Sequence, residues 1–336
     1  MAGPRVLKAL KSGALRESDV QEASRALRAG AVVAFPTETV YGIGANPFDE
    51  QAARRVFRAK RRGEQNPLTC HVSGRDQAAD VVAEISPEAE LLMSRFWPGP
   101  LTLVLLAAGN LPGIIRAGGP GIGVRAPDHP ATRQVLETAG IPIAGTSANV
   151  SGRPAAVRPE DVLAELGAAI DVLIDGGVCR LGVESTVLDL TARPAVIWRL
   201  GAVLPEEIAA VLEQGGLPLD LREAPAPLGG QLSRRPAFRV VVVRKGPEAE
   251  WRAKELAGSF VAAGLKVGLL LDRRTPDLNT AGAQVLVLGI SPERRLYTAL
   301  REAERLGLQV LMFVESDQAG MERIAQRLLK AGGEEV

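Results

Sequence analysis

The sequence predicts two α/β domains, on the strength of three observations. The chain has 336 residues, which is more than one hydrophobic core usually serves. Short aliphatic runs separated by glycine and proline fill its first part, and apolar runs alternate with helical patterns after residue 238. A stretch crowded with glycine and proline lies between them. We therefore expect domains over 1–212 and 238–336, joined by a linker over 213–237.

The first domain is expected to hold a twisted, mixed sheet with helices. Helices are predicted over 18–30, with Ser18 and Gln21 as a capping box, and over 49–62, with Asp49 as N-cap and Gly63 as stop. Strands are predicted over 31–35, 101–106 and 183–190. Connections this short and rich in glycine favour a mixed sheet over a strict βαβ repeat.

The second domain is expected to be a small, Rossmann-like parallel α/β domain. Apolar strand patterns fall at 238–243, 266–271, 284–288 and 308–314. Helical patterns fall at 247–263, 291–306 and 321–331. This alternation is typical of a parallel sheet with helices on its faces.

Composition excludes several classes of protein. The formal net charge of +1 gives no global attraction to nucleic acid, and no apolar run is long enough to cross a membrane. Two cysteines suit a reducing compartment, so we expect a cytoplasmic protein without disulfides. The two histidines and the cysteine spacing match no metal-site pattern, so no protein-bound metal is expected.

A run of cations near the end of the second predicted helix has two interpretations. It contains Arg54, Arg55, Arg58, Lys60, Arg61 and Arg62. Such a run can be a solvated helix terminus, or it can hold the oxygens of a polyphosphate. An RNA-binding module that tracks a phosphate backbone is the alternative from another class, although no aromatic residues are interleaved with the run.

Three further polar blocks stand out, of which the first two follow apolar runs, and none is strong singly because ordinary turn chemistry gives similar blocks. They are Pro-Thr-Glu-Thr-Val-Tyr-Gly at 36–42, Gly-Thr-Ser-Ala-Asn-Val-Ser-Gly at 145–152 and Gly-Val-Glu-Ser-Thr-Val at 182–187. Small hydroxyls beside glycine let backbone amides approach an anion, and strand ends are where α/β proteins commonly bind ligands.

In their order along the chain these blocks resemble a known family. The order is PTETVYG, K-x-R, NPL-x-x-H, FWPGPLT, GVRAPDH, SAN-x-SG, GVESTV and WR-x-G, over about residues 18–205. It is similar to the YrdC-like family of L-threonylcarbamoyladenylate synthases, and the linker and α/β tail resemble the long, two-domain form of that family.

The resemblance implies a reaction and its partners. Such enzymes convert L-threonine, bicarbonate or carbon dioxide, and ATP with Mg²⁺ into threonylcarbamoyl-AMP and pyrophosphate. Other proteins then transfer the threonylcarbamoyl group to certain tRNAs, and relatives with a basic surface raise the expectation of a weak tRNA contact.

The resemblance also implies roles for individual residues. Thr37, His71, Arg125 and Ser185 match positions that hold L-threonine. Lys60, Arg62, Asn66, Gly121, Ser147 and Arg199 match positions at the ATP, with Lys60 and Arg62 expected to be catalytic and to lie on a phosphate site rather than in a core. Arg125 is expected to fork onto the threonine carboxylate.

Several positions depart from the family pattern. Lys60-Arg61-Arg62-Gly63 stands where K-G-R-P is usual, and Ala155-Ala156-Val157 stands where Ser-Pro-Thr is usual. The linker lacks its usual tyrosine and histidine, which also raises the alternative of an inactive regulator. We expect residues 228–235 to cover the site through backbone and Gln231, Arg234 or Arg235.

Overall fold

The structure is a computed structural model that describes residues 3–224, 238–273, 282–289, 292–318, 320–330 and 332–336. The chain forms two compact units, Met1–Ser151 with Ala155–Gly229 and Gly152–Pro154 with Gly230–Val336. The cover expected over residues 228–235 lies outside the described residues.

The first unit is built on a mixed sheet of eleven described strands. Their order is β1-β8-β2-β3-β7-β4-β6-β5-β9-β10-β11. The strands are β1 (Arg5–Lys8), β2 (Val33–Phe35), β3 (Gly42–Ala45), β4 (Thr69–His71), β5 (Leu101–Leu106), β6 (Gly121–Arg125), β7 (Ile143–Ser147), β8 (Val172–Asp175), β9 (Thr186–Asp189), β10 (Ala195–Arg199) and β11 (Leu221–Glu223). Five of the ten neighbouring pairs are parallel and five antiparallel, which confirms the mixed sheet.

Helices cover both faces of this sheet. They are α1 (Glu17–Arg28), α2 (Glu50–Lys60), α3 (Arg75–Ala78), α4 (Pro87–Phe96), α5 (Pro130–Ala139), α6 (Pro159–Leu166), α7 (Pro205–Gln214) and the 3₁₀ turn η1 (Gly167–Ala169). Residues of α1 and α5 share one apolar cluster with Val33 and Phe35, whereas α2, α4, α6 and α7 belong to a larger cluster that contains Ala34. Since successive strand residues face opposite ways, the two clusters lie on opposite faces.

The ends of the two predicted helices are only partly as expected. Asp49 caps α2 by accepting from the backbone N–H groups of Gln51 and Ala52, as predicted. Gly63 does not stop this helix, because Arg61 already adopts the left-handed conformation at φ 51°. Ser18 is not an N-cap either, since α1 begins at Glu17.

The linker expected from residue 213 is wrong at its start. Helix α7 continues to Gln214, and β11 adds an edge strand that runs parallel to β10, with Ala195 opposite Leu221. Three residues of edge strand need no periodic pattern, which explains why composition alone failed to show them.

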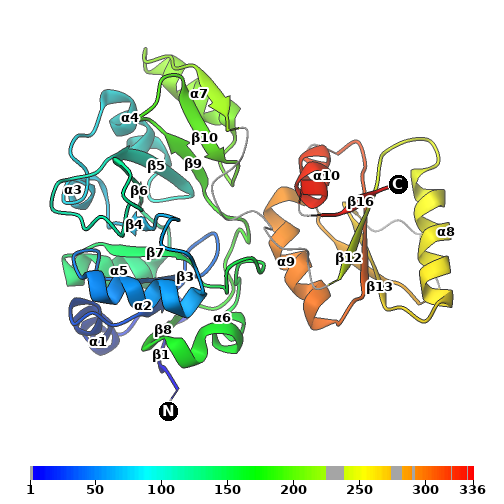
Figure 1. Cartoon of the computed structure of the whole chain (residues 1–336), viewed down its shortest axis with the longest axis horizontal. Helices are drawn as coiled ribbons and strands as arrows, with labels where there is room; N and C mark the ends of the chain where they lie inside the picture. The colour runs from blue at the N-terminus through cyan, green and yellow to red at the C-terminus, as the bar shows by residue number, and fades with distance from the viewer. Residues whose placement is uncertain (1–2, 225–237, 274–281, 290–291, 319, 331) are drawn as a thin grey trace. The chain divides into compact units, whose positions relative to one another are not determined.

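The second unit has a wholly parallel sheet of five described strands, as predicted. Their order is β14-β13-β15-β12-β16, and they are β12 (Arg239–Val243), β13 (Val267–Leu271), β14 (Gln284–Val287), β15 (Val310–Val314) and β16 (Glu334–Glu335). Helix α8 (Ala249–Ala262) covers one face, and α9 (Pro292–Arg305) and α10 (Met321–Lys330) cover the other (Figure 1).

Among the described residues, no helix has the length and the apolar character needed to cross a membrane.

Gly145 lies where two central strands of the first unit, β3 and β7, approach each other closely. A Cβ at this position would lie 2.5 Å from the carbonyl oxygen of Ile43 and 3.1 Å from Cα of Gly44, and backbone cannot turn aside as a flexible side chain can. We expect Gly145→Ala to destabilise the protein by about 1–3 kcal/mol and to lower its thermal midpoint. Gly167→Ala is the matched control, because its nearest neighbour is the Leu163 side chain at 3.7 Å. Equal midpoints for the two variants would contradict this account.

Candidate active site

The centre of the first sheet brings distant parts of the chain to one place. Thr69 pairs with Gly123 and Gly145, and His71 pairs with Arg125 and Ile143. Gly145 is in turn opposite Gly44. Directly paired residues share a face, so Thr69, His71 and Arg125 project on the same side of the sheet.

A cavity of about 50 Å³ lies at this point. It is lined mainly by hydroxyl-bearing side chains, which come from the segment after β2, from β4, β5 and β7, and from the residue before β9. Six of the residues named from the sequence line it, namely Thr37, His71, Arg125, Ser147, Ser185 and Arg199. By volume it has space for a few water molecules, the scale of a small metabolite and not of a nucleotide.

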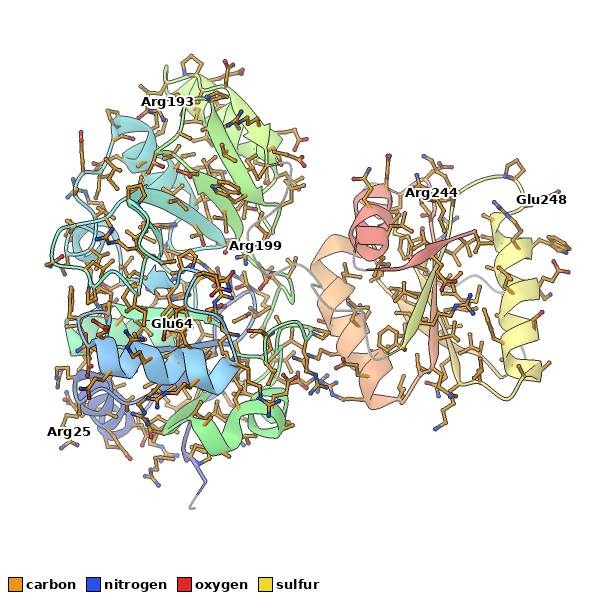
Figure 2. All side chains as sticks on the ribbon, viewed as in Figure 1. Arg25, Glu64, Arg193, Arg199, Arg244 and Glu248 are labelled. Carbon is orange, nitrogen blue, oxygen red and sulfur yellow. The ribbon has the colours of Figure 1, made fainter. Side chains whose placement is uncertain are left out.

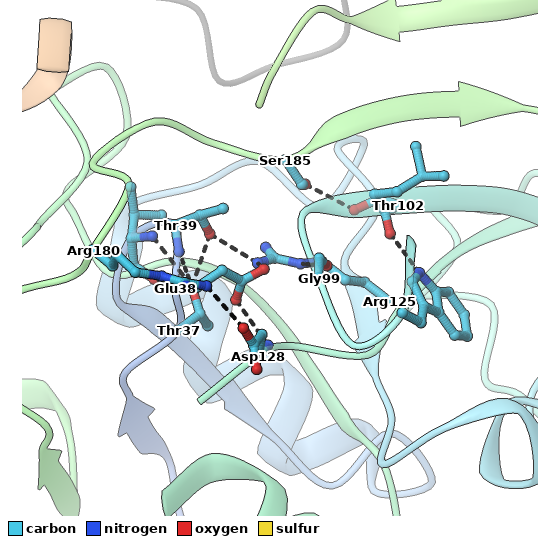
Figure 3. Close-up of polar contacts among 12 residues, drawn as sticks. Thr37, Glu38, Thr39, Gly99, Thr102, Arg125, Asp128, Arg180 and Ser185 are labelled. Carbon is cyan, nitrogen blue, oxygen red and sulfur yellow. Dashed lines mark hydrogen bonds and ion pairs between the residues drawn. The ribbon is translucent and has the colours of Figure 1, made fainter. Parts of the chain in front are cut away.

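Arg125 is held at the cavity wall by a buried ion pair with Glu38. Its Nη2 lies 2.7 Å from Glu38 Oε1 and donates to Thr39 Oγ1 at 2.9 Å, and its Nε donates to the Gly99 carbonyl (Figure 3). The side chains are 5% and 1% exposed. Nη1 makes no hydrogen bond within the described part of the chain. Arg125 was expected to contact a ligand carboxylate through two nitrogens. Since Nε and Nη2 already have partners, Nη1 is the nitrogen that could make such a contact.

Ser185 joins the cavity to a second arginine. Its Oγ lies 2.8 Å from Thr102 Oγ1 and accepts from Arg199 Nη2 at 3.0 Å, while Arg199 Nε donates to the Ser185 carbonyl. Nη1 of Arg199 lies 3.4 Å from Glu184 Oε2 in an ion pair. Arg199, labelled in Figure 2, thus has its guanidinium fixed on three sides.

His71 enters the cavity as a neutral ring. It is buried, packs edge-on against Phe35 at 5.0 Å between ring centroids, and has Nδ1 3.4 Å from the Ile143 carbonyl. Burial and, to a lesser degree, the positive charge of Arg125 lower the pKa of His71 to about 3. The ring can therefore offer one donor and one acceptor at neutral pH, but not a positive charge.

Lys60 does not lie where it was expected. Its side chain is buried rather than presented on an open phosphate site. Nζ donates to the carbonyl oxygens of Ser147 and, at 2.7 Å, of Asn149. Burial, assisted by the charge of Arg62, lowers the pKa of Lys60 to about 7. In this structure Lys60 fixes the loop that carries Ser147, because the final turn of α2 directs the side chain inward.

The remaining residues named for ATP are spread more widely. Arg62 donates to the carbonyls of Asn66 and Pro67, and burial lowers its pKa while nearby Glu184 opposes that shift. Asn66 donates to the Gly63 carbonyl and does not line the cavity. Gly121 begins β6, four residues before Arg125, and is not brought to the cavity.

The basic run of α2 does not form one cationic face. Arg54 pairs with Glu50 and Glu64, and Arg55 pairs with Asp171 at 2.7 Å. Lys60 is buried. Carboxylates and burial thus occupy half of the run, which weakens the case for an RNA-binding module.

Two acidic residues belong to the site although the sequence reasoning did not assign them roles. Glu38 holds Arg125 and also accepts from the Asp128 backbone N–H at 2.9 Å. Glu184 lines the cavity, is buried, and its Oε2 accepts no hydrogen bond among the described residues. Their only sequence signal was a glutamate within each of two polar blocks, and a glutamate in a turn is normally solvated.

The donor set allows Mg²⁺ only as a companion of phosphate. In the described part of the chain no three histidine, cysteine or acidic side chains gather as a metal site. Mg²⁺ is commonly held by one or two carboxylates together with substrate phosphates, and Glu184 is the carboxylate at this cavity that could supply such a ligand.

A mixed α/β unit with a hydroxyl-lined cavity, a neutral imidazole and neighbouring arginines is suited to a small carboxylate-bearing ligand beside a phosphate. Residues 25–201 match the Sua5_yciO_yrdC family, described as "Telomere recombination". The chain belongs to this family.

Two curated relatives match nearly the whole chain, and both are called threonylcarbamoyl-AMP synthase. The protein from Pyrococcus abyssi is 38% identical over 95% of each chain, and that from Bacillus subtilis is 32% identical over 95% of this chain and 94% of its own. The crystal structure of P. abyssi Sua5 complexed with L-threonine is similar at a TM-score of 0.85, with 34% identity over 98% of this chain and 99% of that one.

Lys60→Met tests whether this lysine supports the fold. The substitution keeps the length of the side chain but removes the Nζ hydrogen bonds to the carbonyls of Ser147 and Asn149, each worth about 1–3 kcal/mol. We expect a clear fall in the thermal midpoint. Arg58→Met in the same helix is the control, because Arg58 is exposed and, among the described residues, its side chain donates to the Arg54 carbonyl alone. A Lys60→Met protein as stable as the control would contradict a structural role.

His71 makes stability depend on pH in a defined window. Its pKa is about 3 in the folded protein and about 6.5 in the unfolded chain, so between these values only the unfolded chain binds the proton. This contribution is complete above pH 6.5 and is lost as the pH falls toward 3. We expect the thermal midpoint of His71→Gln to decline less steeply than that of the wild type between pH 6.5 and 4. Parallel curves would show that His71 is not buried as a neutral ring.

Proposed function

We propose that this protein synthesises threonylcarbamoyl-AMP from L-threonine, bicarbonate or carbon dioxide, and ATP, with release of pyrophosphate. The observation that carries the proposal is the cavity lined by hydroxyl groups beside Arg125 Nη1, which makes no hydrogen bond to the described residues, with Arg199 at its wall. The relatives' name and the threonine bound to a similar structure support the same substrate.

The cavity matches the groups of L-threonine. Nη1 of Arg125 can donate to the carboxylate, because Glu38 and Gly99 already hold the rest of that guanidinium. Neutral His71 and the hydroxyls of Thr37 and Ser185 can satisfy the substrate's polar groups. Since Glu38 fixes Arg125 in advance, little ordering is needed when the amino acid arrives.

ATP would lie outside this small cavity, beside the cations at its edge. Arg62 and Arg199 lie near the same carboxylate: Glu184 pairs with Arg199 and raises the pKa of Arg62, which burial and the charge of Arg199 lower. Two guanidinium groups in this arrangement can hold phosphate oxygens, and Mg²⁺ bound with ATP would neutralise further charge. Lys60 acts through the loop that positions Ser147.

The chemistry requires positioning more than covalent work by the protein. The neutral threonine amine adds to carbon dioxide and releases a proton, which gives a carbamate. A carbamate oxygen attacks the α-phosphorus of ATP, and the bond to pyrophosphate breaks. No side-chain nucleophile is needed, so a high effective concentration of the reactants and stabilisation of charge account for the rate.

The product, a mixed anhydride, would pass to other proteins that transfer the threonylcarbamoyl group to tRNA. We place this work in the cytoplasm, where tRNA and ATP meet. A weak contact of this chain with tRNA belongs to the same proposal.

Product analysis tests the proposed reaction. We expect threonylcarbamoyl-AMP and pyrophosphate only when ATP, Mg²⁺, L-threonine and bicarbonate are all present. L-Valine is the matched control substrate, because it has the shape of threonine but leaves the cavity's hydrogen-bonding groups unpaired, a large penalty. Pyrophosphate release that continues without threonine or bicarbonate, or equal use of valine, would overturn the proposal.

A further inference from the structure

The second unit contains a larger cavity that the proposed reaction does not use. Its volume is about 560 Å³, within the range of sites for small molecules. It is lined by the segments that follow three parallel strands, namely Lys245–Pro247 after β12, Asp272 after β13 and Glu315–Gln318 after β15.

The strand order places this cavity at a switch point of the sheet. Strands β13 and β15 are neighbours. After β13 the chain continues to β14, on the side of β13 away from β15, whereas after β15 it passes through α10 to β16, on the other side beyond β12. Helices α8 and α10 lie on opposite faces of the sheet (Figure 1). Open parallel sheets bind ligands at the carboxyl ends of strands where neighbouring connections diverge in this way.

Glu315 is the second and independent sign of a ligand. Its side chain is 0% exposed, and Oε2 pairs with Arg244 Nε at 2.8 Å and accepts from the Lys245 backbone N–H. Oε1 has no hydrogen-bond partner among the described residues, although Glu315 lines the cavity. A buried carboxylate oxygen without a donor is costly, so a group that donates to it would be bound favourably.

The other side of the cavity is formed by the first turn of α8. Ala249 and Glu250 line the cavity there, and no side chain caps this fourteen-residue helix. The turn between β12 and α8 carries Arg244 and Glu248, which are labelled in Figure 2. Uncapped N–H groups and the helix dipole favour an anionic group.

Asp272 gives the cavity a second ordered carboxylate. Its Oδ2 accepts from Ser316 Oγ at 2.7 Å, which fixes Ser316 just after the carboxyl end of β15. Lys245 and Asp317 form an ion pair of 3.4 Å that is largely exposed. No group of three metal-binding side chains occurs in the portion of the chain that the structure describes, so the pattern does not indicate a cation site.

We propose that this cavity binds a small metabolite that carries hydrogen-bond donors for Glu315 and an anionic group for the first turn of α8. Two sources have this chemistry. An α-amino acid offers an ammonium and a carboxylate, and a nucleoside monophosphate offers ribose hydroxyls and a phosphate. The second unit is thus a ligand-binding unit in its own right, and its site stands whether or not the proposed synthase reaction does.

Binding to the full chain can be measured and located together. The probes are the twenty α-amino acids as one arm and AMP, GMP, CMP and UMP as the other, each tested by calorimetry at up to 5 mM. Hydrogen–deuterium exchange with the best probe should show protection in peptides over 243–252 and 314–318. Protection confined to the first unit, or no binding in either arm, would overturn the proposal.

Variants separate this site from the first one. We expect Glu315→Gln, which keeps an oxygen for Arg244, to weaken binding at least tenfold, and Asp272→Asn to weaken it as well. Glu334→Gln is the control, because Glu334 forms an exposed pair with Arg239 and does not line the cavity. If Glu315→Gln fails to fold, the result for Asp272→Asn decides. Unchanged affinity in the variants that fold would refute the site, while the product assay judges the proposed reaction independently.

Discussion

The buried ion pair between Arg125 and Glu38 is the contact on which the first unit's site depends. Arg125 ends β6, and Glu38 follows β2, which is four strands away in the sheet. Glu38 also accepts from the Asp128 backbone N–H, so its carboxylate joins the segment after β2 to the end of β6 and the residues that follow it. Removing one partner of such a pair leaves an unpaired buried charge, at a cost of about 3–5 kcal/mol. The geometry of the cavity wall is therefore fixed before any ligand enters.

The two sides of this site differ in net charge. Arg125 is neutralised by Glu38, so its remaining nitrogen can bind a carboxylate without adding a net positive charge to a buried cavity. Among the described residues, Glu184 is the one carboxylate paired with Arg199 and acting on Arg62, so excess positive charge remains where the proposed phosphates would lie. The near-neutral net charge of the whole chain hides this local difference.

Lys60 shows how a motif residue can have a structural position that its sequence does not reveal. The lysine ends α2, and the helix turns it away from solvent toward the carbonyls of Ser147 and Asn149. A lysine in a basic run is ordinarily solvated. Here Lys60 instead donates to two backbone carbonyls of the polar block at 145–152, so the two motifs are in direct contact.

The sequence by itself determined the α/β class, the parallel second sheet and the Asp49 cap, since periodicity and capping patterns are properties of neighbouring residues. Six of the residues at the cavity came from the resemblance of the ordered motifs to a known family. Tertiary structure alone decided that β11 extends the first sheet, that Gly121 lies away from the cavity, and that Lys60 is buried. It also decided that Glu38 and Glu184 are part of the site and that Glu315 faces a second cavity. These features depend on contacts between residues far apart in the chain, and the register and order of strands that create such contacts leave no local pattern.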